Sequence, residues 1–77
     1  MNAAEHFAWA RTRALEYVER DDPGNAMASL IQDLRSHEGT AGILHPDLQT
    51  LFLGEILIGG TAGARSFIKG LAGPNGG

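Results

Sequence analysis

Apolar residues recur at helical spacing along this 77-residue chain, and this periodicity constrains its fold more than any other feature. Met27, Leu30, Ile31 and Leu34 follow the i, i+3, i+4, i+7 pattern of a helix with one buried stripe. No run of residues alternates between apolar and polar for long enough to require a strand. The sequence therefore predicts an all-α protein.

Glycine, proline and capping residues mark where the predicted helices begin and end. Asp22 and Pro23 suit the N-cap and the first position of a helix, and Pro46 suits the first position of another. The glycine pair at Gly59 predicts a helix end. We expect a compact bundle of three to four short helices, over residues 2–20, 23–37, 46–58 and 61–71.

The length of the chain allows one domain at most, because a chain this short buries only about 60–65% of the surface that it exposes when unfolded. We expect a single helical domain over residues 1–72 and a flexible, glycine-rich tail over residues 73–77. The sequence has no cysteine, which excludes disulfides and thiolate metal sites. Small secreted domains usually need such cross-links, and the first residues lack the pattern of a signal peptide. We therefore expect a cytoplasmic protein.

The charge pattern argues against nucleic acid and membrane partners. The net charge is −3, and the six Lys and Arg residues form no basic stripe. A recognition helix built from PDLQTLFLGEILI would offer two carboxylates and no cation to phosphates. The uncharged run over residues 56–64 is nine residues long, whereas a membrane span needs about 20. A DNA-associated transcriptional regulator built on the helical bundle nevertheless remains the alternative function.

No motif in the sequence has the spacing of a catalytic or cofactor site. His6, His37 and His45 lie in separate segments without metal-ligand spacing, and Asp21 and Asp22 are typical of a turn. The glycines of GGTAGAR lack the preceding strand and the following Lys-Ser/Thr pair of a phosphate loop. We expect no enzymatic activity, no cofactor and no metal, and rank a small hydrolase or metal-dependent enzyme third.

The charged side of the first predicted helix is the candidate site for a protein partner. It carries Trp9, Arg13, Glu16 and Arg20. Trp and Arg are among the residue types that most often anchor protein interfaces. The alternative is that Trp9 is structural and is covered by the loop near Ile43 or by the tail.

Two charged residues fall among apolar positions on the predicted helices. Glu55 lies on the apolar side of the third helix, and Arg11 lies beside Phe7 on the apolar side of the first. A charge in the core is tolerated only when it is paired and hydrogen-bonded. We predict a structural ion pair between Arg11 and Glu55, with Arg65 as the second candidate cation. A functional carboxylate at Glu55 is the competing hypothesis.

The third predicted helix is apolar on more than one side. Leu53 and Leu57 lie opposite Leu48, so either the fourth helix covers them or a second chain does. Leu53 and Leu57 are therefore the candidate self-association residues, and we expect a homodimer if the fourth helix leaves them exposed.

A set of spaced residues resembles a group of small helical proteins of actinobacteria and their bacteriophages that has no assigned catalytic residues. The resemblance covers about residues 10–72 and is carried by Ala14, Tyr17, Asp22, Asn25, Ala26, Asp33, Leu34, His37, Gly54, Arg65, Phe67, Ile68 and Gly70. Asp21 departs from the pattern, which usually has Gly there, and the spacer before RSFIKG is short. The resemblance implies a non-enzymatic accessory protein, in the host cytoplasm if a phage encodes it, that binds a host or defence protein or itself.

Overall fold

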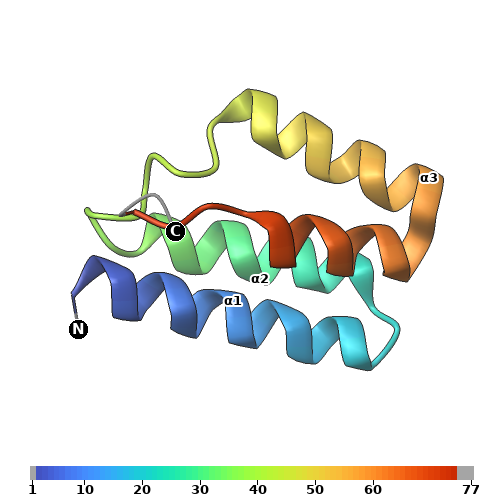
Figure 1. The fold of residues 1–77 in the computed structure, drawn as a ribbon, viewed down its shortest axis with the longest axis horizontal. Coiled ribbons are helices and arrows are strands. Elements are labelled where there is room, and N and C mark those ends of the chain that lie inside the picture. The colour runs from blue at the N-terminus through green and yellow to red at the C-terminus, as the bar shows by residue number, and fades with distance from the viewer. Residues whose placement is uncertain (1, 75–77) are drawn as a thin grey trace.

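The structure is a computed structural model that describes residues 2–74, and this part of the chain contains three α-helices and no strand (Figure 1). The helices are α1 (Ala3–Glu19), α2 (Pro23–Arg35) and α3 (Pro46–Gly70). The predicted all-α bundle is confirmed, and α3 contains both the third and the fourth predicted helices. The last three residues of the predicted tail, 75–77, lie outside the described residues.

Side-chain caps define the starts of α1 and α2. The Asn2 side chain accepts a hydrogen bond from the Glu5 backbone N–H at 2.8 Å, and the Glu5 carboxylate accepts one from the Asn2 N–H at 3.2 Å. Between the helices Asp21 adopts a φ of 58°, a left-handed conformation that favours glycine. Asp22 then caps α2 as predicted, accepting from the Asn25 N–H at 3.3 Å.

Helix α2 ends at Arg35, two residues before the predicted end at His37. The buried Thr40 hydroxyl folds back and donates to the Leu34 carbonyl at 2.6 Å, which satisfies one of the carbonyls left open at the helix end. The chain then runs through consecutive turns to the start of α3. His37 therefore lies beyond the helix and not in its last turn.

Helix α3 reverses direction at Gly60, where φ is 58° and ψ is −137°. We call residues 46–59 the first limb and residues 61–70 the second limb. The two limbs lie side by side, because the rings of Phe52 and Phe67 stack with their centroids 4.3 Å apart. A straight helix would separate these residues by about 22 Å. The predicted glycine stop is thus a reversal within one helix.

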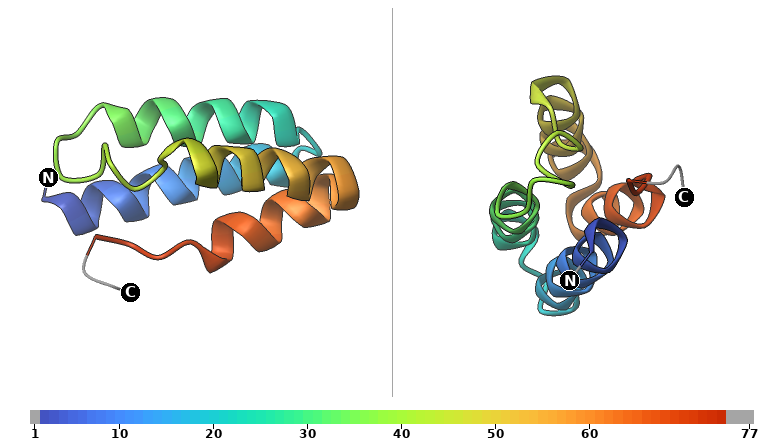
Figure 2. Two further views of the ribbon diagram at one scale, coloured as in Figure 1. Left: turned by 90° about the horizontal axis from the view of Figure 1, so that it is seen from above. Right: turned by 90° about the vertical axis from the view of Figure 1, so that its left-hand side faces the viewer.

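Seen end-on, the four helical segments stand at the corners of a bundle (Figure 2). The first limb and α1 occupy opposite corners, with α2 and the second limb between them. The hydrophobic core lies at the centre: Phe7, Ala10, Ala14, Val18, Ala26, Leu30, Leu34, Leu44, Phe52, Ala64 and Ile68. The first limb contributes one side chain to this core, Phe52, whereas α1 contributes four.

Candidate interaction surface

The first limb carries large aliphatic side chains on the side that faces away from the core. The exposed fractions are 59% for Leu51, 46% for Leu53, 77% for Leu57 and 92% for Ile58. Together with Gly54 we call these residues the outer face. The second limb leaves them uncovered because it packs against the opposite side of the first limb, at Phe52. Helical periodicity indicated Leu53 and Leu57 as candidate self-association residues but not Leu51 and Ile58.

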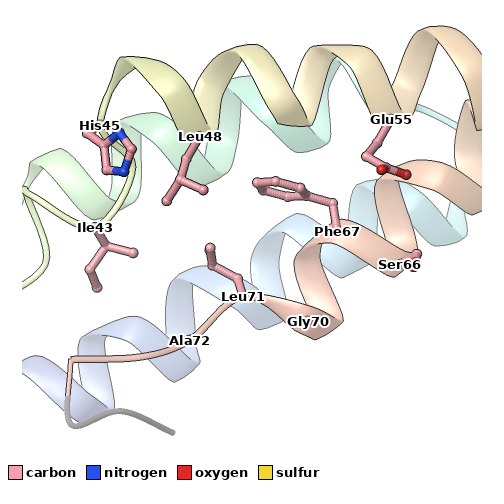
Figure 3. A pocket seen from close by; sticks show the side chains of 9 residues that line it. All are labelled: Ile43, His45, Leu48, Glu55, Ser66, Phe67, Gly70, Leu71 and Ala72. Carbon is pink, nitrogen blue, oxygen red and sulfur yellow. The ribbon is translucent and has the colours of Figure 1, made fainter.

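Two grooves flank the first limb. One groove, of about 590 Å³, lies between the two limbs (Figure 3). Ile43, before the first limb, and Leu71 and Ala72, after the second, also line it. Leu48, Phe67 and Leu71 give it apolar walls, and Glu55 lies at one end of it. The other, of about 360 Å³, lies between the first limb and α2 and includes Leu53. The first limb therefore lies between two grooves.

The predicted ion pair between Arg11 and Glu55 is not formed. Glu55 is exposed at the groove, and the guanidinium carbon of Arg11 lies 5.2 Å from the centroid of the Phe7 ring. The two side chains cannot meet because α1 and the first limb occupy opposite corners of the bundle (Figure 2). The ion pairs within residues 2–74 are Arg13–Asp33 and Arg65–Glu19. Arg65, the second candidate cation, therefore does not neutralise Glu55 either.

Two of the predicted partner-binding residues of α1 are held by contacts within the chain. Arg13 Nε donates to Asp33 Oδ2 of α2 at 2.7 Å, and this hydrogen bond raises the pKa of Arg13 above its usual value. The Arg13 guanidinium carbon also lies 5.0 Å from the centroid of the Trp9 ring. The Trp9 ring is tilted against His6 at 5.1 Å and remains 39% exposed. These ring contacts of Trp9 come from α1 itself, whereas the structural alternative expected cover from the loop near Ile43 or from the tail.

Glu16 and Arg20, the other two predicted partner-binding residues, are exposed. The Arg20 guanidinium carbon lies 5.7 Å from the centroid of the Tyr17 ring, and neither residue joins an ion pair among the described residues. The structure thus brings Trp9 and Arg13 into contact with each other. Glu16 and Arg20 take no part in that contact or in the hydrogen bond from Arg13 to Asp33.

His6, Asp33 and Ser36 come together between α1 and α2, a grouping that the sequence did not reveal. His6 Nε2 is 2.5 Å from the Asp33 carbonyl oxygen and 3.2 Å from Ser36 Oγ. A carbonyl oxygen can only accept a hydrogen bond, so Nε2 carries the proton. Ser36 Oγ donates to the same carbonyl at 2.7 Å. Nε2 therefore has no lone pair with which to activate the serine, and the cluster joins the two helices.

The described residues contain no metal-binding cluster. Within residues 2–74, no three side chains of His, Cys, Asp or Glu are grouped so as to hold a metal ion. The His6 and His37 rings are neighbours, with centroids 4.9 Å apart, whereas His45 lines the groove between the two limbs. Among residues 2–74, the two neighbouring rings therefore belong to no group of three such side chains.

Helix α3 is long and apolar enough, by length and composition, to be a candidate membrane span. Its reversal at Gly60 divides it into limbs of about 21 and 15 Å, at 1.5 Å for each residue. Each limb is shorter than the bilayer hydrocarbon core of about 30 Å.

The outer face of the first limb is the largest group of uncovered aliphatic side chains in the described part of the chain. Comparison with known proteins found no matching family model, curated protein or solved structure. Among the described residues, the outer face is therefore the candidate interaction surface.

Proposed function

We propose that this chain is a small non-enzymatic protein-interaction module that binds through the outer face of the first limb. The observation that carries the proposal is the exposure of Leu57 and Ile58, at 77% and 92%, beside Leu51 and Leu53. Contiguous exposed apolar surface is uncommon on monomers and marks interaction sites. Covering an aliphatic side chain contributes about 1.5–3 kcal/mol before the costs of association.

The outer face is not needed to build the hydrophobic core. The first limb packs on the core through Phe52, with Leu48 and Ile56 partly buried beside it. A helix at the corner of a bundle needs only this one apolar stripe, and polar residues on its outer side would fold as well. Aliphatic residues on that outer side are therefore better explained by binding than by folding.

The chemistry of the outer face favours a protein as its partner. The first limb contains no Lys or Arg, and its charged residues, Asp47 and Glu55, are both acidic. Nucleic acids require cations on the surface that binds them. The resemblance noted in the sequence extends the proposal to an accessory protein of actinobacteria or their phages, acting in the cytoplasm on a host or defence protein or on itself.

Affinity capture from an actinobacterial lysate tests this proposal. We expect the wild-type chain to retain a protein that Ile58→Glu and Leu57→Glu lose, because a carboxylate on the outer face is not buried without a partner. Gln32→Glu adds the same charge at an exposed position of α2 and should retain the protein. Equal retention by all variants would contradict the proposal.

A further inference from the structure

We propose that the outer face binds a second copy of this chain, with the two first limbs antiparallel and crossing at Gly54. This inference rests on the proposed function, because it names the partner of the same face. In a single chain the outer face is exposed to water. In a symmetric pair, one interface removes the outer faces of both copies from water.

The arrangement of side chains around Gly54 is self-complementary. Gly54 lies one helical turn from Leu51 on one side and one turn from Leu57 and Ile58 on the other. A Cβ at Gly54 would meet nothing within 4 Å, so the helix surface is open there. When two such helices cross antiparallel at Gly54, Leu51 of each copy lies beside Leu57 and Ile58 of the other. The missing side chain allows the two backbones to approach closely at the crossing point.

The charges of the first limb favour the antiparallel direction. A parallel pair would set Asp47 beside its own copy, and like charges at short distance repel. The antiparallel pair separates the two Asp47 residues by about 21 Å along the helix axis, since each lies seven residues from Gly54. The Glu55 side chain lies at the groove between the two limbs and not on the outer face (Figure 3).

The charge of the first limb argues against a lipid surface as the occupant, and its size sets the strength of the pairing. Helices that lie on lipid surfaces usually carry Lys and Arg along their polar side, and the first limb has neither. The limb is about 21 Å long, so its pairing covers less than the roughly 800 Å² that each partner buries in a standard interface. The dimer is therefore weak, with a dissociation constant between about 10 µM and 1 mM.

The first test measures mass by light scattering or sedimentation across about 10 µM to 1 mM. We expect the wild-type mass to rise with concentration from 8.1 kDa towards twice that value. Ile58→Glu should stay at the monomer mass, with a dissociation constant raised at least roughly 100-fold, because pairing would bury its carboxylate. Gln32→Glu should behave as the wild type does. A dimer that Ile58→Glu leaves intact would overturn the assignment of the outer face.

The second test determines direction through single cysteines, since the chain has none of its own. A disulfide requires Cα atoms within about 7 Å, so Gly54→Cys should cross-link on mild oxidation and Asp47→Cys should not. Ile58→Glu combined with Gly54→Cys should suppress the cross-link, which excludes random collision as its source. Equal cross-linking at the two positions would overturn the antiparallel arrangement.

A wild-type chain that remains monomeric at the highest concentration would overturn the second copy as the occupant. If the lysate protein is still captured through Ile58, the proposed function stands with a different partner. If lipid vesicles bind the wild-type chain and not Ile58→Glu, the face belongs to a lipid surface, and both proposals are overturned. If none of these associations is found, both proposals are overturned as well.

Discussion

Helix α1 and the first limb of α3 both turn large side chains towards solvent, at opposite corners of the bundle (Figure 2). On α1, Trp9 and Arg13 contact each other, and Arg13 is bonded to Asp33 of α2. On the first limb, Leu57 and Ile58 are left exposed. Polar groups can form hydrogen bonds with neighbours or with water, and aromatic rings can contact neighbouring rings and cations. An aliphatic side chain is stabilised only when apolar contacts remove it from water. The type of exposed residue therefore indicates an interface better than exposure alone.

The largest effect should separate the inner and outer sides of the first limb. Phe52→Ala should lower the free energy of unfolding by about 3–5 kcal/mol, because it leaves a cavity in the core. Ile58→Ala should change it by less than about 0.5 kcal/mol, because Ile58 is exposed. Urea denaturation of dilute protein measures both. Similar losses would mean that the two sides of the limb are equally buried.

The same substitution at two glycines of α3 should have opposite effects. A Cβ at Gly63 would lie directly against the Glu55 carbonyl oxygen, so Gly63→Ala should destabilise the reversal by about 2–3 kcal/mol. Gly54→Ala meets no neighbour and should stabilise the dilute monomer by about 0.5–1 kcal/mol, since alanine is the better helix former. Thermal unfolding followed by circular dichroism measures both. A change of the same sign at both positions would contradict the packing of the two limbs.

Removal of the internal partner on α1 should have a moderate effect. Asp33→Ala removes the carboxylate that accepts from Arg13 and from the Ser29 hydroxyl. We expect a loss of about 1–2 kcal/mol, because Asp33 is buried but the Arg13 side chain is 45% exposed to water. Glu38→Ala, at an exposed position outside these hydrogen bonds, serves as the control in the same denaturation experiment. Equal stability of the two variants would mean that the hydrogen bond between Arg13 and Asp33 does not stabilise the fold.

The smallest effect concerns Trp9, which is the single tryptophan of the chain. Because α1 lies at the corner opposite the first limb, the fluorescence of Trp9 should not change with protein concentration (Figure 2). Acrylamide quenching should likewise be equal in dilute and concentrated samples, since Trp9 is 39% exposed in the monomer. A spectral shift with concentration would place α1 in the interface and contradict the assignment of association to the outer face.

Local sequence signals predicted the helices well because they act between neighbouring residues. Asp22 caps α2, Pro46 begins α3, and the reversal at Gly60 follows the predicted glycine stop. The end of α2 was placed too late, because the hydrogen bond that draws the chain away comes from Thr40, beyond the helix. The candidate surface was found in part: Leu53 and Leu57 were named, but periodicity alone did not show how far the exposed side extends.

The sequence by itself determined the all-α class and the positions of the helices, since helical periodicity and caps depend on residues within a few positions of each other. Only the tertiary structure decided which charges meet. Arg13 bonds Asp33, and the expected contact of Arg11 with Glu55 is absent, because packing places α1 beside α2 and opposite the first limb. The sequence showed that the first limb was apolar on several sides. Which side stayed in water was decided by the direction in which the chain folds back at Gly60.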